Sequence, residues 1–161
     1  MTALRTAGPA DAGAVTAVIN AAYQVERFFI DGDRTSEDEV LRYMAKGVFL
    51  VAEDVDGAVG CVYVETRGDR GYFGLLAVDP GQHGKGLGRT LVQAAEEHLR
   101  RAGCRAVDIS VVDLRTELPP FYRRLGYAQT GTAPFPDPHK ATRPCHFILM
   151  SKPLTAEASR D

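Results

Sequence analysis

A glycine-dense loop between an apolar stretch and an amphipathic helix is the segment whose residue types and spacing most directly indicate chemistry. From Leu75 to Gly103 the chain reads LLAVDPGQHGKGLGRTLVQAAEEHLRRAG, with glycines at positions 81, 84, 86 and 88. A loop with so few side chains exposes successive backbone N–H groups, and the helix behind it adds the positive end of its dipole. Such an arrangement binds phosphate or pyrophosphate, so we expect a phosphorylated cofactor here.

Two other phosphate-binding motifs fit this segment less well. A P-loop needs a serine or threonine after its Gly-Lys pair, whereas Gly84-Lys85 is followed by Gly86, so a P-loop is excluded. A dinucleotide-binding turn needs G-x-G-x-x-G directly after its strand, with an acidic residue about 20 positions further on. The spacing here is G-x-G-x-G, and five residues separate Val78 from Gly84. Asp108 does stand at the acidic position, so this turn remains an alternative with a poorer fit.

The run LAVDPGQHGKGLGRTLV resembles the acyl-CoA loop of the GNAT superfamily of N-acyltransferases. In that family a Val-x-Pro strand exit, here Val78-Asp79-Pro80, precedes the pattern Arg/Gln-x-x-Gly-x-Gly/Ala, here residues 83–88. His83 departs from the pattern, which has Arg or Gln there, and Gln82 stands beside it. The resemblance implies that acetyl-CoA lies along the strand with its pyrophosphate on the loop. The residues implied to bind it are Leu76, Ala77, Val78, His83, Gly84, Lys85, Gly86, Leu87, Gly88 and Arg89.

A second motif, PFYRRLGY at residues 120–127, resembles the F-Y-x-x-x-G-F/Y segment of the same superfamily. There a short helix delivers a tyrosine to the CoA sulfur, so the resemblance implies that Tyr122 protonates the leaving thiolate. The alternative is that Tyr122 only packs its helix.

The family also often has an asparagine after the fifth strand that contacts cofactor or substrate, and Asp113 takes that place here. The resemblance extends from Leu4 to about Lys152.

The implied reaction is direct attack of a primary amine on the thioester of acetyl-CoA in a ternary complex. An alkyl ammonium has a pKa of about 10.4, so a base or a water chain must remove its proton. Glu65, near the end of the third expected strand, is the best-placed carboxylate for this, directly or through water. The alternative is that Glu65 is a solvated side chain at a strand end.

Acceptor-binding residues are expected in the connection between the first two helices and in the last hairpin. Phe28 and Phe29 could form an apolar wall, with Asp31 or Asp33 attracting an ammonium group, or the two phenylalanines could be core anchors. His146, within the last strand, could face the same slot or be a structural histidine. We expect a small-molecule amine as acceptor, with a protein lysine or N-terminus as a variant. A non-catalytic acyl-CoA-binding module is the alternative from another functional class.

The elements that position these residues follow the order β-α-α-β-β-β-α-β-α-β-β. Strands are expected at 3–7, 48–53, 58–65, 71–78, 106–112, 127–132 and 144–150. Helices are expected at 9–23, from about 36 to 47, from the glycine loop to Gly103, and at 119–125. This order is the GNAT arrangement and implies an α/β (mixed α+β) fold, with a mostly antiparallel sheet of about seven strands and helices on both faces. In the family the fourth strand carries a bulge and splays from the fifth into a V-shaped slot, and Gly74 fits either a kink there or the relief of packing.

Composition agrees with one domain at residues 1–154, followed by a frayed polar tail at 155–161. The net charge of −2 gives no electrostatic reason to expect nucleic acid as a partner. No apolar run is long enough to span a membrane, and the N-terminus lacks the apolar stretch of a secretion signal. The three cysteines cannot all pair and lack metal-site spacing, so we expect a cytoplasmic protein without a metal. A homodimer through the last strands is implied by the family resemblance alone.

Overall fold

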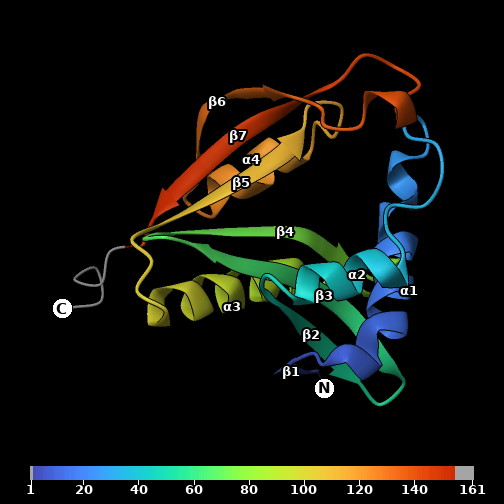
Figure 1. Ribbon diagram of the computed structural model, residues 1–161, viewed down its shortest axis with the longest axis vertical. Coiled ribbons are helices and arrows are strands. Elements are labelled where there is room, and N and C mark those ends of the chain that lie inside the picture. Colours follow the sequence, from blue (N-terminus) through green and yellow to red (C-terminus); the bar gives the residue numbers. More distant parts are fainter. Residues whose placement is uncertain (1, 155–161) are drawn as a thin grey trace.

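The computed structural model describes residues 2–154, which form a seven-stranded sheet with helices on both faces (Figure 1). The expected order of strands and helices is confirmed, and the expected tail at 155–161 lies outside the described residues. The strands are β1 (Ala3–Thr6), β2 (Val48–Asp54), β3 (Gly57–Arg67), β4 (Arg70–Val78), β5 (Ala106–Val112), β6 (Ala128–Pro134) and β7 (His146–Pro153). The helices are α1 (Ala12–Ala22), α2 (Glu37–Met44), α3 (Leu87–Arg101) and α4 (Leu118–Arg124). Short 3-10 turns are η1 (Pro9–Asp11), η2 (Tyr23–Glu26), η3 (Pro80–Gln82) and η4 (Pro138–Lys140).

The sheet has the order β1-β2-β3-β4-β5-β7-β6, and every neighbouring pair is antiparallel except β4 and β5. A parallel pair needs a crossover connection, which α3 supplies. The two parallel strands pair only where residues 70–72 meet residues 106–108. Beyond that point they diverge, as the V-shaped gap between β4 and β5 in Figure 1 shows. We call this gap the slot.

A β-bulge sits in β4 where the slot begins to widen. Gly74 pairs with Tyr63 and Ala77 pairs with Cys61, so Leu75 and Leu76 together stand opposite one residue of β3. Leu75 has a φ of 51°, which a side chain with a Cβ adopts at a steric cost. In a regular strand alternate residues share a face, and the bulge reverses this alternation.

The two faces of the sheet carry separate hydrophobic cores, and β4 contributes to both. Phe73, before the bulge, packs in the core beneath α3, together with Leu91 and Leu99. Leu75, only two residues later, packs in the core beneath α1 together with Ile19. The bulge therefore lets one strand supply large side chains to both sides of the sheet.

Gly74 has a packing role next to the bulge. A Cβ atom added at Gly74 would lie 2.3 Å from the hydroxyl oxygen of Tyr72, whose ring therefore occupies the space beside it. Both interpretations of this glycine have a counterpart in the structure, since it admits the Tyr72 ring and the backbone departs from regular strand geometry at the next residue.

Specific polar contacts position the helices. Ser36 accepts a hydrogen bond from the Glu39 N–H at 3.2 Å and caps α2, as its spacing predicts. The buried Glu96 of α3 accepts hydrogen bonds from the Tyr127 hydroxyl at 2.7 Å and from Lys152 Nζ at 3.1 Å. Because Tyr127 precedes β6 and Lys152 lies in β7, Glu96 connects α3 to the far half of the sheet. Among the helices of residues 2–154, none has the length and apolarity needed to cross a membrane.

Candidate active site

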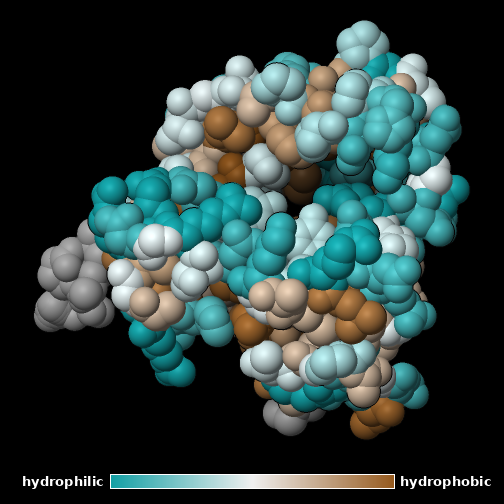
Figure 2. Space-filling view, viewed as in Figure 1, coloured by the Kyte–Doolittle hydropathy of each residue, from teal (hydrophilic) through white to brown (hydrophobic). Residues whose placement is uncertain are grey.

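The divergence of β4 and β5 opens a cavity of about 310 Å³, which is the candidate active site. Its walls come from β4 (residues 72–76), β5 (residues 109–112), α4, the α1–α2 connection and the β6–β7 connection. Figure 2 shows a hollow between the half of the molecule that contains β4 and the half that contains β5, with a hydrophilic rim and hydrophobic residues at depth. Its volume lies near the lower end of small-molecule sites, which are roughly 300–1,000 Å³.

The edge of β4 that faces the slot carries backbone groups without a partner strand. On its other side β4 pairs continuously with β3 apart from the bulge, but its pairing with β5 ends at Tyr72 and Asp108. Within the described residues, the β4 backbone from Phe73 to Val78 therefore meets the slot instead of a neighbouring strand. An extended chain with amide groups can pair with such an edge, as a further strand would.

The glycine loop has the geometry of an anion site. Gly84 and Gly86 have φ values of 83° and 77°, which glycine adopts without strain, and α3 begins at Leu87 without a side-chain cap. Thr90 is the first residue of the helix whose N–H reaches a backbone carbonyl, that of Gly86. In residues 2–154 no acceptor is recorded for the N–H groups from Gly84 to Arg89. These donors and the helix dipole can receive a pyrophosphate.

The start of α3 lies beside the strand exit and beside α4. A Cβ added at Gly88 would lie 3.9 Å from Val78 Cγ2 and 3.7 Å from Phe121 Cζ. Two motifs that stand more than 30 residues apart in the sequence therefore meet at one point. The glycine loop, the slot and Tyr122, the neighbour of Phe121, form one continuous region.

Tyr122 lines the cavity and is 5% exposed. Its ring packs against Phe73 and Tyr127, and no hydrogen-bond partner of its hydroxyl is recorded among residues 2–154. Burial raises the pKa of the Tyr122 hydroxyl above its ordinary value of 10.0; the nearby Tyr23 hydroxyl also raises it, and Arg115 opposes both. The hydroxyl therefore stays protonated at neutral pH and is available to donate a hydrogen bond to a sulfur atom in the cavity.

Glu65, the base expected from the sequence, lies outside the cavity lining. Its carboxylate accepts hydrogen bonds from the Tyr63 hydroxyl at 2.6 Å and from Arg67 Nε at 2.7 Å. Burial raises the pKa of Glu65, but these two hydrogen bonds, together with the positive charges of Arg67 and Lys46, outweigh burial and hold the pKa below its ordinary value. A carboxylate so stabilised in its ionised form is a weak base, which argues against this prediction.

Glu26 is a cavity carboxylate that the sequence did not single out as a base. It is 9% exposed, and its Oε2 accepts a hydrogen bond from Arg115 Nη1 at 2.9 Å. Burial raises the pKa of Glu26 above its ordinary 4.5, although Arg115 opposes the rise. In the sequence, Glu26 stands out only as the first residue of the aromatic and acidic connection that runs to Arg34. Its partner Arg115 is 89 residues away, so no local pattern links the two residues.

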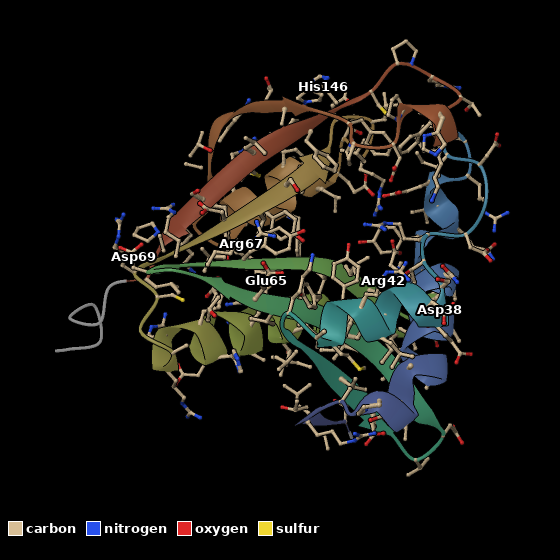
Figure 3. All side chains as sticks on the ribbon, in the orientation of Figure 1. Asp38, Arg42, Glu65, Arg67, Asp69 and His146 are labelled. Carbon is tan, nitrogen blue, oxygen red and sulfur yellow. The ribbon has the colours of Figure 1, made fainter. Side chains whose placement is uncertain are left out.

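The remaining candidate residues, apart from Asp33, fall outside the cavity lining. Asp113 accepts the His146 N–H at 2.9 Å, so it fixes the end of β5 to the start of β7. His146 is exposed and lies at the upper edge of the molecule, far from Glu65 (Figure 3). Phe29 is fully buried as a core anchor, Phe28 is half exposed against it, and Asp31 is exposed. Residues 2–154 contain no group of three potential metal ligands.

Solved structures with this fold extend over nearly the whole chain. Ribosomal-protein-S18-alanine N-acetyltransferase from Escherichia coli superimposes with a TM-score of 0.79, at 17% identity, over 96% of this chain and 95% of that one. The yncA protein of Salmonella typhimurium, solved with its cofactor acetyl-CoA, gives a TM-score of 0.75 at 22% identity, over 99% of this chain and 98% of that one. At these identities the likeness concerns the fold.

Curated relatives are closer in sequence. Mycothiol acetyltransferase of Propionibacterium freudenreichii is 34% identical over 137 residues, which are 79% of this chain and 44% of that protein. Glucosamine 6-phosphate N-acetyltransferase 1 of Oryza sativa is 31% identical over 105 residues, 60% of this chain and 62% of that protein. The chain thus spans less than two thirds of either relative. A family model described as the acetyltransferase (GNAT) domain matches residues 45–129, more than half of the chain. The chain belongs to the GNAT family of acetyltransferase domains.

Proposed function

We propose that this protein transfers the acetyl group of acetyl-CoA to a primary amine of a small molecule. The observation that carries the proposal is the continuity of three features: the unpaired edge of β4, the unsatisfied N–H groups of the loop, and the buried hydroxyl of Tyr122. Each matches one part of an acyl-CoA molecule, namely the pantetheine amides, the pyrophosphate and the sulfur. The curated relatives support the proposal, since they are named as acetyltransferases of small molecules, mycothiol and glucosamine 6-phosphate.

In this proposal acetyl-CoA supplies an acyl thioester, whose carbonyl carbon is attacked by the amine. The N–H groups from Gly84 to Arg89 hold the pyrophosphate, and the edge of β4 orients the pantetheine. Glu26 takes a proton from the acceptor's ammonium group, which frees the nitrogen lone pair. As the carbon–nitrogen bond forms and the carbon–sulfur bond breaks, Tyr122 gives its proton to the sulfur. The second proton lost by the amine then restores the tyrosine hydroxyl.

The size of the cavity favours a small acceptor over a protein side chain. Its volume of about 310 Å³ must hold both the acetyl end of the cofactor and the acceptor. Segments of both connections, residues 26–34 and 135–140, contribute to its walls. A lysine or N-terminus of a protein would need an open groove for the flanking chain, so this variant is the weaker one.

Titration of the purified protein with acetyl-CoA in a calorimeter tests the proposal. We expect a dissociation constant in the micromolar range, which corresponds to about −8 kcal/mol. Incubation of the same protein with acetyl-CoA and a panel of amines should then release free thiol in proportion to acetylated amine. The absence of binding at about millimolar acetyl-CoA would overturn the assignment of the loop and the slot. Binding without thiol release for any amine would favour the non-catalytic acyl-CoA-binding module.

Glu26 as the base gives a prediction about pH. In the wild type kcat/KM should rise with pH through the pKa of Glu26, which lies above 4.5, because only the ionised carboxylate accepts a proton. The Glu26→Gln variant should lose about tenfold in kcat/KM at pH 7 and lack this rise. The deficit should shrink toward pH 10, because the free amine then forms without a base, given its pKa of about 10.4. Initial rates of thiol release between pH 5 and 10 measure both profiles.

The matched control for this experiment is Glu65→Gln. Glu65 contacts Tyr63 and Arg67 and lies outside the cavity lining, so its pH profile should follow that of the wild type. If the rise of kcat/KM with pH disappeared in Glu65→Gln but persisted in Glu26→Gln, the assignment would be reversed and Glu65 would be the base.

A further inference from the structure

Arg34 stands in the cavity wall without an acidic partner. It lies in the α1–α2 connection, and its guanidinium carbon is 5.4 Å from the centroid of the Tyr23 ring. In the part of the chain that the structure describes, no carboxylate forms an ion pair with it. A guanidinium in a largely buried wall normally pairs with a carboxylate, because its charge loses hydration there. An unpaired one is therefore suited to an anionic group of a ligand.

The backbone around Arg34 is fixed by its neighbour. The Asn20 side chain of α1 donates to the Thr35 carbonyl and accepts from the Thr35 N–H, each at 3.0 Å. These two hydrogen bonds fasten the connection to α1 directly after Arg34. The guanidinium is thus presented from an ordered position and not from a free loop, which lowers the entropy cost of binding a ligand.

Apart from Lys140, the other charged side chains that line the cavity with Arg34 are already engaged or are acidic. Arg115 donates to Glu26 and also to Glu117 at 2.8 Å, and Asp33 accepts from Arg27 at 3.1 Å. Glu39 accepts a hydrogen bond from the Thr35 hydroxyl. Lys140 of η4 lines the same cavity and is exposed. The cavity therefore presents a half-buried guanidinium without an ion pair, beside carboxylates that can receive an ammonium group.

We propose that Arg34 binds a carboxylate of the acceptor, so that the acceptor is a compound of the amino acid class, with its amine and its carboxylate close together. The inference rests on the proposed function and names its substrate class. Arg34 lies over the Tyr23 ring, Glu26 ends the 3-10 turn that Tyr23 begins, and all three line the cavity, so a cation and an acid lie near this one residue. A molecule that carries both charges a few bonds apart complements this arrangement, with its ammonium toward Glu26 and Tyr122.

A carboxylate fits this place better than a phosphate. A planar carboxylate can accept two parallel hydrogen bonds from one guanidinium, which gives both affinity and orientation. A phosphate monoester carries close to two negative charges at neutral pH and would need more than one buried cation, whereas Glu26 and Glu39 would repel it. The remaining cation, Lys140, is at the exposed rim.

Matched pairs of acceptors test the inference. Each pair is an L-α-amino acid and the amine that remains after its decarboxylation, such as phenylalanine and phenethylamine, assayed by thiol release with saturating acetyl-CoA. We expect kcat/KM to be at least tenfold higher for the preferred amino acid than for its amine. In Arg34→Gln this preference should disappear through a rise of at least tenfold in KM for the amino acid, with a smaller change in kcat. Arg34→Lys should restore part of the preference.

The control is Arg42→Gln, which removes the same charge from the exposed end of α2 outside the cavity lining (Figure 3). It should keep the preference of the wild type. Equal rates on both members of every pair, a preference that survives in Arg34→Gln, or acetylation of amines alone would overturn the inference and leave the proposed function standing. A wild-type protein that binds no acetyl-CoA would overturn both.

Discussion

Replacement of Tyr122 by phenylalanine should lower kcat about 100-fold while the dissociation constant for acetyl-CoA stays unchanged. The variant keeps the ring, which packs against Phe73 and Tyr127, and removes only the hydroxyl that lines the cavity. A positioned general acid contributes roughly 10²–10⁴-fold, and a thiolate can also take its proton from water, so the lower end is expected. Steady-state thiol release gives kcat, and calorimetry gives the affinity.

Tyr127→Phe is the matched control, because it removes another buried tyrosine hydroxyl from the same aromatic cluster. That hydroxyl donates to Glu96 and has no place in the cavity lining, so its loss should reduce the free energy of unfolding by about 1–2 kcal/mol. Its kcat should stay at the wild-type value. If Tyr122→Phe turned over as fast as Tyr127→Phe, Tyr122 would be a packing residue and the thiolate would be protonated in another way.

Replacement of Gly86 by valine should weaken acetyl-CoA binding about 100-fold. Gly86 has a φ of 77° directly before α3, and a β-branched residue is a steric outlier in this region. Relief of the strain rotates the peptide groups from Gly84 to Leu87, so their N–H groups no longer point to a common anion. Calorimetric titration of the variant with acetyl-CoA measures the loss.

Gly103→Val controls for the backbone strain itself. Gly103 has a φ of 91° after the other end of α3, and a Cβ there meets no atom within 4 Å, as at Gly86. Both variants should lower the melting temperature by similar amounts, since the steric problem is the same. Only Gly86→Val should lose affinity for acetyl-CoA. Equal affinity losses in both would attribute the effect to general destabilisation, and the loop would lose its role as the pyrophosphate site.

Local signals in the sequence predicted the fold and the cofactor side of the site. Each of these signals lies within a short stretch of sequence, so its spacing can be read directly. They are the glycines of the loop, the Val-x-Pro exit of the strand and the hydrophobic spacing of α3. The order of strands and helices was predicted from such patterns, and the sheet of about seven strands was implied by the resemblance to the GNAT superfamily; both are confirmed. The boundaries shifted by a few residues, as for β7, which starts at His146 and not at Pro144.

The acceptor side could not be predicted from spacing, because distant segments assemble it. Glu26 becomes a buried cavity carboxylate only because Arg115, 89 residues away, lies opposite it. Glu65 was predicted as the base from its position near the end of a strand. The sequence does not show that the hydroxyl of Tyr63, on the same face of β3, donates a hydrogen bond to the Glu65 carboxylate. His146 and Asp113 lie at paired strand ends and bind each other outside the cavity lining.

The bulge at Leu75 restricts how the gene for this protein can change. Loss of one codon within the bulge would return β4 to regular alternation, with the single remaining leucine in the place of Leu76, so the core beneath α1 would lose the side chain of Leu75. Loss of a codon elsewhere in β4, with the bulge retained, would instead shift the strand by one residue and turn the side chains beyond it to the opposite face. Substitutions can accumulate along this strand one at a time, whereas a change in its length would alter both cores and the slot in a single event. Natural variation in the length of this chain is therefore expected in the connections around the cavity, where acceptor preference can change without disturbing the cofactor.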